Sequence, residues 1–302
     1  MKNKKNCRRP LHNNKLAEQF VINILGITDD SEIKKSVHNI VNAEIALARL
    51  EEHPTHTHTD YRDLSYSTNL DRNKLHNQIL KELITLERLR DDDEICLGKG
   101  GAKPSKEQND SRAFIVMGAP ASGKSGISSR LANHYGAYII DSDYAKRKFP
   151  EYSQYEGGAS LVHTESDDII FDSENGLFVY CIYNSNNVVI PLVGKTFSSV
   201  DKICQTLIAA GYSISLIDVV LDRYKCAQRA YKRFCDKKRY VPLSYVFDEV
   251  GNEPERVYYL LKRKYDSEEK IDCFAQISTD VPMGNPYKVL ENTGRLPLDG
   301  LE

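Results

Sequence analysis

The residues from Phe114 to Ser125 have the types and spacing of a phosphate-binding loop. They read FIVMGAPASGKS and contain a Gly-x-x-x-x-Gly-Lys-Ser pattern that begins at Gly118 and ends at Ser125. Glycines at this spacing let the backbone wrap so that several N–H groups point at phosphate oxygens. We expect Lys124 to bridge the β- and γ-phosphates of a nucleoside triphosphate, and the Ser125 hydroxyl to bind Mg²⁺.

The sequence on both sides of this loop supports nucleotide binding over the alternative of a Gly-rich surface turn. Apolar FIVM precedes the loop, and GISSRLANHYG follows it with apolar residues at helical spacing. A helix over 124–135 would add its positive N-terminal dipole to the same anion site. We therefore predict ATP and Mg²⁺ as cofactors. The predicted nucleotide-binding residues are Gly118, Ala119, Pro120, Ala121, Ser122, Gly123, Lys124, Ser125 and Gly126.

Two carboxylates follow the next apolar run, which ends in Ile139-Ile140-Asp141-Ser142-Asp143. Carboxylates at the carboxyl end of a strand lie at the sheet edge where the phosphates would bind. One of them could deprotonate an acceptor hydroxyl during phosphoryl transfer. The alternative is a turn or helix cap for the following segment, a use that Asp143 would also fit.

Basic side chains recur on a helix predicted from Tyr224 to Lys237. Arg229 and Arg233 are one turn apart and therefore share a face of this helix. Such a pair could close over a polyphosphate and stabilise transition-state charge. A solvated basic face is the alternative interpretation.

Apolar periodicity predicts the elements that must position these groups. Strands are expected at 137–140, 187–192, 213–221 and 273–278, with helices at 198–210, 224–237, 242–250 and 255–265. Strands rich in β-branched residues that alternate with helices indicate an α/β fold with a parallel sheet flanked by helices. A P-loop lies at the carboxyl end of its strand in that architecture.

The part of the chain before the P-loop is predicted to be helical. Apolar spacing predicts helices over 31–52 and 71–90, and the polar stretch 98–112 has the Gly, Lys and Ser content of a linker. We therefore divide the chain near Ser111. The expected units are a helical N-terminal region with its linker over 1–110, the P-loop domain over 111–280 and a C-terminal tail over 281–302.

Composition limits the location and the partners of the protein. The 41 basic and 43 acidic residues of this 302-residue chain leave a net charge of −2, which gives no support for nucleic-acid binding. No apolar stretch is long enough to span a membrane. The basic residues 1–15 lack the apolar run of a secretion signal and are expected to be disordered. Seven scattered cysteines without a CxxC pair are typical of a cytoplasmic protein with reduced thiols.

Four segments together resemble the zeta toxin family: the P-loop, DSDYAKRKFPEY, GYSISLIDVVLD and AQRAYKRFCDKKRYVPLSYV. The similarity covers about Ala113 to Asp248 and includes YSTNLDRNKLHNQIL just upstream. This family consists of P-loop small-molecule kinases found in toxin–antitoxin systems and in some secreted effectors. The resemblance implies a P-loop kinase core and an ATP-dependent phosphotransferase that acts on a hydroxyl of a nucleotide-linked small molecule, such as a nucleotide sugar or NAD.

The resemblance also implies roles for individual residues. Asp143 matches the proposed catalytic base of the family, and Asp141 is its neighbour in the DxD element. Arg229 and Arg233 match the lid arginines that grip the phosphates, and Arg239 matches the basic residue before Val-Pro. An antitoxin or a chaperone is implied as a partner, with the cytoplasm or, for an effector, a host cell as the location.

The chain departs from the family at the end of the third strand. Family members have an acidic residue before a Gly-Thr pair, whereas this chain has Val193-Gly194-Lys195-Thr196. The missing carboxylate puts UDP-N-acetylglucosamine in doubt as the acceptor. Thr196 remains a candidate for substrate binding, as do His163 and Glu165, for whose segment the start of a helix is the alternative use.

Two other function classes share these features. One is an NTPase that couples ATP hydrolysis to partner binding, with Asp218 in the apolar run SLIDVV as its metal-binding carboxylate. The other is a polynucleotide kinase, which would need a basic groove and salt-sensitive binding.

Overall fold

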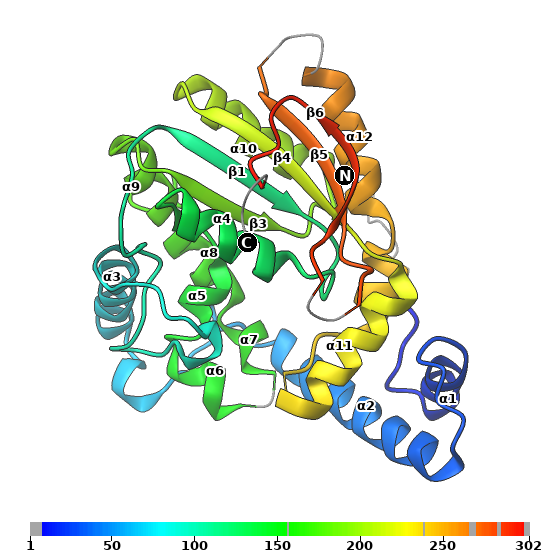
Figure 1. Ribbon diagram of the computed structural model, residues 1–302. Helices are drawn as coiled ribbons and strands as arrows, with labels where there is room; N and C mark the ends of the chain where they lie inside the picture. Colours follow the sequence, from blue (N-terminus) through cyan, green and yellow to red (C-terminus); the bar gives the residue numbers. More distant parts are fainter. Residues whose placement is uncertain (1–7, 156, 238, 266–269, 283–284, 299–302) are drawn as a thin grey trace.

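A central sheet organises the structure, a computed structural model that describes residues 8–155, 157–237, 239–265, 270–282 and 285–298 (Figure 1). The six strands follow the order β2-β3-β1-β4-β5-β6. Neighbours from β2 to β5 pair in parallel, and β6 is antiparallel to β5. The bounds are β1 (Arg112–Met117), β2 (Tyr138–Ile139), β3 (Val188–Leu192), β4 (Ser213–Val220), β5 (Cys273–Ser278) and β6 (Lys288–Thr293).

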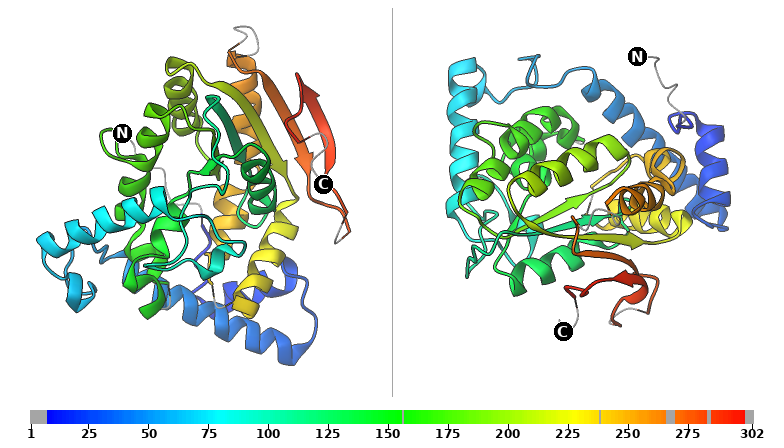
Figure 2. Two further views of the ribbon diagram at one scale, coloured as in Figure 1. Left: turned by 60° about the vertical axis from the view of Figure 1, so that its left-hand side comes forward. Right: turned by 90° about the horizontal axis from the view of Figure 1, so that it is seen from above.

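The predicted α/β fold with a mostly parallel sheet is confirmed. Five of the six residues of β1 are buried, and so are six of the eight residues of β4. Such continuous burial arises because helices cover both faces of a parallel sheet. Figure 2 shows α4 (Lys124–His134) on one face, with α10 (Phe197–Ala209) and α12 (Glu253–Tyr265) on the other. The antiparallel edge strand β6 was not predicted.

The predicted helices that border the sheet are confirmed with small shifts at their ends, but other helices differ from the prediction. The predicted helix over 242–250 is a π-helix, η3 (Tyr245–Val250). Between β2 and β3 the described residues form five short helices, α5 (Ser142–Lys146), α6 (Pro150–Gln154), α7 (Gly158–Leu161), α8 (His163–Phe171) and α9 (Leu177–Tyr183). Of these, the sequence offered only the starts of α5 and α8, as alternative uses of their segments.

The helix predicted over 71–90 is α3 (Asn69–Thr85), and it packs into the core of the sheet. Its residues Leu75, Ile79 and Leu83 are fully buried in the same cluster as Ile115 of β1. This helix ends earlier than predicted because Leu86 adopts an extended backbone conformation.

The stretch 98–112 begins as packed structure, so its interpretation as a linker is wrong for its first half. The N–H of Ala102 donates to the carbonyl of Leu83 at 2.9 Å, and Ala102 is fully buried. A Cβ at Gly101 would lie 2.1 Å from the carbonyl oxygen of Leu86. The glycine is required for this close approach, although it suggests flexibility in the sequence. Residues 98–99 and 105–110 of this stretch are exposed.

The N-terminal helices pack against helices from the second half of the chain. Helices α1 (Asn14–Asn23) and α2 (Asp30–Glu51) share a second hydrophobic cluster with η3 and with α11 (Arg223–Lys237). In this cluster Phe20 of α1 meets Phe247 of η3 edge to face, at 5.9 Å between ring centroids. Figure 1 shows α2 running beneath both α7 and α11. At its other end, Leu47 and Leu50 of α2 lie against Gly157.

The prediction that residues 1–15 are disordered is partly wrong. Residues 1–7 lie outside the described residues, but the chain from Arg8 onward is docked. Arg9 pairs with Asp248 of η3 through two side-chain hydrogen bonds of 2.9 and 2.7 Å. The side chain of Asn13 caps α1 by accepting from the N–H of Leu16. No helix in the described ranges is long and apolar enough to cross a membrane.

The shared core predicts how the N-terminal region unfolds. We expect Ile79→Ala to lower the free energy of unfolding by about 2 to 5 kcal/mol, because the cavity would lie in the core shared by α3 and the sheet. Urea denaturation should show one transition, shifted as a whole, while Lys81→Ala on the same helix changes little. Two separate transitions would contradict the shared core and favour an independently folding domain after residue 111.

Candidate active site

The P-loop connects β1 to α4 through a turn that few residues can adopt. Gly118 and Gly123 have φ angles of 150° and 100°, and Ala121 is also in the left-handed region at 64°. A Cβ at Gly118 would lie 2.6 Å from the carbonyl oxygen of Val219 on the neighbouring strand β4. The second glycine immediately precedes Lys124, the first residue of α4. The helix dipole and the free N–H groups of its first turn therefore face the loop.

Lys124 folds back over this loop. Its Nζ atom donates to the carbonyl oxygens of Gly118 and Ala119 at 2.6 and 2.8 Å. Burial lowers the pKa of Lys124 to about 8, and Asp141 partly offsets this effect. A polyphosphate at the loop would give this ammonium an anionic partner in place of the two carbonyl oxygens.

The Ser125 hydroxyl is the group beside the P-loop that is open to a bound Mg²⁺. Ser125 is exposed in the first turn of α4. Across the described ranges, no group of three or more His, Cys, Asp or Glu side chains is arranged to hold a metal ion. Mg²⁺ usually takes one or two protein ligands together with phosphate oxygens and water. The Ser125 hydroxyl would therefore hold the ion jointly with the nucleotide.

The two aspartates after β2 have different uses. An oxygen of Asp141 accepts from the N–H of Asp143 at 2.9 Å and caps α5. The capping role considered for Asp143 thus belongs to Asp141. The carboxylate of Asp143 instead pairs with Lys146 at 3.0 Å and with Arg239.

The charges around this pair move their pKa values apart. Burial raises the pKa of Asp143, but Lys146, Arg239 and Arg147 outweigh it and hold the pKa well below its ordinary value. Burial and the charge of Asp143 raise the pKa of Asp141 to about 6. Asp143 is therefore ionised at neutral pH and can accept a hydrogen bond from a hydroxyl group.

The two arginines of α11 face different surroundings. Arg229 donates to the Thr279 carbonyl at 3.0 Å, and the Thr279 hydroxyl donates to the Ser122 carbonyl of the P-loop at 2.5 Å. The Nε atom of Arg233 is buried and has no hydrogen-bond partner within the described part of the chain. Burial and the nearby Arg239 lower the pKa of Arg233, while Asp143 opposes this shift.

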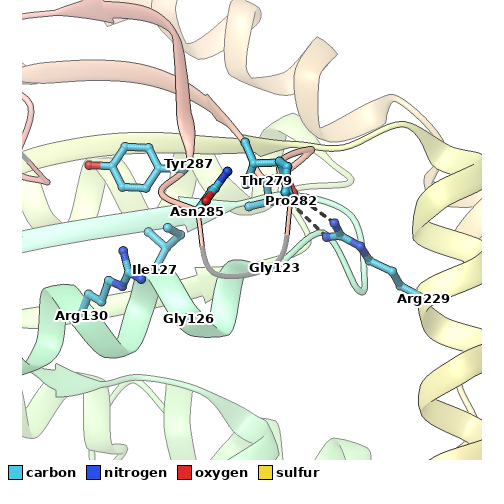
Figure 3. A pocket seen from close by; sticks show the side chains of 10 residues that line it. Gly123, Gly126, Ile127, Arg130, Arg229, Thr279, Pro282, Asn285 and Tyr287 are labelled. Atoms are coloured by element: carbon cyan, nitrogen blue, oxygen red, sulfur yellow. Dashed lines mark hydrogen bonds between the residues drawn. The ribbon is translucent and has the colours of Figure 1, made fainter. Parts of the chain in front are cut away.

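A pocket of about 240 Å³ lies beside the P-loop on the side of Arg229 (Figure 3). Side chains from α4, from α11 and from the segment after β5 line it. They belong to Ile127, Arg130, Arg229, Thr279, Val281, Pro282, Asn285 and Tyr287, next to Gly123 and Gly126. The sequence prediction placed Thr279 in the P-loop domain without assigning it a role, and it missed the lining residues after 280 because 281–302 was taken as a tail. The signal available was the end of the predicted strand 273–278, which reaches the same sheet edge as the P-loop.

The structure does not place the remaining candidates in one cluster. The His163 side chain is 59% exposed at the start of α8, where partial burial and the nearby Lys146 lower its pKa. Thr196 is exposed just before α10 and bonds Ser199 at 2.6 Å. His163 therefore lies near the Lys146 that pairs with Asp143, whereas Thr196 contacts Ser199 of α10.

Glu165 has a structural role in place of the expected contact with substrate. Both of its oxygens accept from Arg72 of α3, at 2.9 and 2.6 Å, and its pKa is lowered to about 2 by this pairing despite burial. Arg72 also pairs with Glu151 of α6 at 2.7 Å, and its side chain is only 2% exposed. Arg72 lies in the upstream segment YSTNLDRNK, so this segment serves to join α3 to α6 and α8.

Asp218 lies inside the sheet and matches a metal-binding carboxylate poorly. It is 1% exposed and accepts from the Gln276 amide at 3.0 Å. Burial raises the pKa of Asp218 to about 7, so the carboxyl group is largely protonated below that pH. This finding weakens the NTPase alternative.

The burial of Asp218 predicts a specific dependence of stability on pH. Its folded-state pKa lies above its usual value, so its contribution to stability is full below about pH 4 and is lost as the pH rises through about 7. As the pH rises between these limits, the free energy of unfolding of wild type should fall by about 1 to 4 kcal/mol relative to that of Asp218→Asn. Urea denaturation of both proteins from pH 4.5 to 8 measures this difference. Parallel profiles would mean that Asp218 is ionised in the folded protein.

Comparisons with known proteins agree with this geometry. The model of the family described as "Zeta toxin" matches residues 99–269, more than half of the chain. No curated protein matches the sequence.

Three solved structures are similar to this chain at low identity. A structure of the PezAT toxin–antitoxin system of Streptococcus pneumoniae is 14% identical, with 74% of this chain and 82% of that chain covered and a TM-score of 0.49. The AvrRxo1-ORF1:-ORF2 complex with ATP is 14% identical, with 74% and 67% covered and a TM-score of 0.46. A gluconokinase from Sinorhizobium meliloti 1021 is 15% identical, with 58% and 86% covered and a TM-score of 0.32.

Proposed function

The chain belongs to the zeta toxin family, and from this premise we propose that it is an ATP-dependent kinase that phosphorylates a hydroxyl of a nucleotide-linked small molecule. One observation carries the proposal. Lys124 follows β1 and the ionised Asp143 follows β2, the two strands on either side of β3. Arg233 is close enough to interact electrostatically with both side chains. A transferring phosphoryl group needs a cation, an acceptor of the hydroxyl proton and a further positive charge.

In this proposal the triphosphate of ATP binds the loop from Gly118 to Gly126. The nucleoside would extend into the pocket beside Tyr287 and Asn285, whose aromatic and amide groups suit a nucleobase. Mg²⁺, held by Ser125 and the phosphates, supplies neutralisation of the phosphate charge when it is bound.

Asp143 orients the acceptor hydroxyl and receives its proton. As the hydroxyl oxygen forms its bond to the γ-phosphorus, the bond to the bridging oxygen of ADP breaks. Lys124 and Arg233 stabilise the charge that develops on the phosphoryl and leaving oxygens. The low pKa of Asp143 implies late proton transfer, which suits the loose transition state of phosphoryl transfer. Arg239 and Lys146 hold the carboxylate in place.

A nucleotide sugar and NAD are the acceptors that we consider first. Both carry hydroxyl groups and phosphates. The loop after β3 has Val193 before Gly194, where family members have an acidic residue, and Lys195 follows this glycine. Asp141, His163, Thr196 and Arg239 are the candidate residues on this side. We propose that the protein acts as a toxin or effector that depletes such a metabolite, with an antitoxin or chaperone as its partner.

The kinase proposal predicts a large effect at Asp143. We expect Asp143→Asn to lower phosphoryl transfer by about a hundredfold or more, because the hydroxyl loses its proton acceptor. The assay incubates each protein with ATP, Mg²⁺ and a panel of nucleotide sugars, NAD and nucleosides, and reads the products by mass spectrometry. Asp236→Asn, on the exposed face of α11, serves as the matched control. A loss of less than about threefold would rule out Asp143 as the base, and ADP release without a phosphorylated product would favour an NTPase.

The two arginines of α11 should give different kinetic effects. Arg229→Gln is expected to raise KM for ATP about tenfold with little change in kcat, because Arg229 borders the nucleoside pocket. Arg233→Gln is expected to lower kcat about a hundredfold, because its charge acts on the phosphoryl group in the transition state. Steady-state kinetics with the acceptor found above separate the two effects. The same pattern in both variants would show that the residues act as one phosphate clamp.

A further inference from the structure

Lys195 lies at the sheet edge between the P-loop and the aspartate pair. The strand before it, β3, lies between β1 and β2, and Leu192 is in register with Met117 immediately before the P-loop. A tight turn brings the lysine back toward this edge. Gly194 has a φ angle of 70°, and a Cβ there would lie 3.1 Å from the Met117 sulfur.

One carboxylate joins Lys195 to the N-terminal segment. An oxygen of Glu249 accepts from the Lys195 ammonium at 2.5 Å, and the other oxygen accepts from the Arg8 guanidinium. The ring of Tyr245 contacts both cations, with its centroid 4.8 Å from Arg8 Cζ and 5.5 Å from Lys195 Nζ. Two cations therefore share one anion, so these three groups together carry one excess positive charge.

Tyr245 also connects this group of charges to the neighbourhood of Asp143. Lys146, which pairs with Asp143, is close enough to Tyr245 to oppose the rise in the pKa of that phenol, as Lys195 does. The Lys195 side chain is 36% exposed, so it is partly open to solvent. An anion at this position would be bound by Lys195 while the reacting hydroxyl meets Asp143.

We propose that Lys195 binds a phosphate group of the acceptor and that Arg8 is its positioning residue, acting through Glu249. This inference rests on the proposed kinase function. Without Arg8, the whole charge of Glu249 would fall on Lys195 and neutralise it. With Arg8 bound to one oxygen, Lys195 keeps its orientation on the other and can still attract an anion. The N-terminal segment thereby completes a site that lies more than a hundred residues away along the chain.

Binding of inorganic pyrophosphate tests the proposal without knowledge of the acceptor. The full-length protein is first titrated with a non-hydrolysable ATP analogue and Mg²⁺, and pyrophosphate is then titrated into the saturated complex by calorimetry. Lys195→Met should weaken pyrophosphate binding about tenfold or more, because a charge-assisted hydrogen bond is lost. Arg8→Gln should weaken it about threefold to tenfold.

A double mutant separates positioning from a general charge effect. In the Glu249→Gln background, Arg8→Gln should have no further effect, because its intermediary is gone. Arg9→Gln is the matched control, since Arg9 docks the same segment but pairs with Asp248, and it should change the affinity less than twofold.

The opposite results would overturn the positioning role of Arg8, the phosphate site at Lys195 or the kinase function. Equal losses for Arg8→Gln in both backgrounds, or an equal loss for Arg9→Gln, would exclude positioning through Glu249. Unchanged affinity in Lys195→Met, or no binding of pyrophosphate to wild type, would exclude the phosphate site while leaving the kinase proposal intact. Failure of the ATP analogue to bind would overturn the proposed function and this inference with it.

Discussion

The parallel pairing of β1 with β3 and β4 is the constraint on which the candidate site depends. Parallel strands end at one edge of a sheet, so the segments that follow them meet there although they are far apart in the sequence. The P-loop follows β1, Lys195 follows β3, and Thr279 follows β5. Asp141 and Asp143 follow the short edge strand β2. The close packing of Gly118 on Val219 then fixes the P-loop against β4.

Positive charge at this edge divides the site into two parts. On one side, Arg229 is tied to Thr279 and borders the pocket next to Tyr287. On the other, Lys146 and Arg239 surround Asp143 and keep it ionised in spite of burial. Arg233 lies on the same face of α11 as Arg229, yet its surroundings belong to the aspartate side. One turn of α11 therefore separates the arginine beside the pocket from the arginine beside Asp143.

The sequence predicts best where burial is continuous and worst where partners are distant. The strand 273–278 was predicted with its observed bounds because apolar residues fill it, and the P-loop was predicted because its glycines have a local conformational reason. Position in the sequence could not reveal that Glu165 pairs with Arg72, because that pair joins residues 93 apart. The glycine at 101 was misinterpreted as flexible because the atoms that approach it belong to Glu82 of α3 and to Leu86, which caps this helix. The exposed strand β6 has no buried face to give a periodic signal.

The docking of Arg8 and Arg9 also has a consequence for protein synthesis. Their partners on η3 are 241 and 239 residues further along the chain. At typical translation rates, the ribosome needs roughly ten to fifty seconds to make that much chain. During this time the apolar faces of α1 and α2 have no partner from η3 or α11, so they are exposed to chaperones and proteases. This segment thus depends on partners that are made more than two hundred residues later, and a truncated product released before residue 249 lacks the contact that holds Lys195.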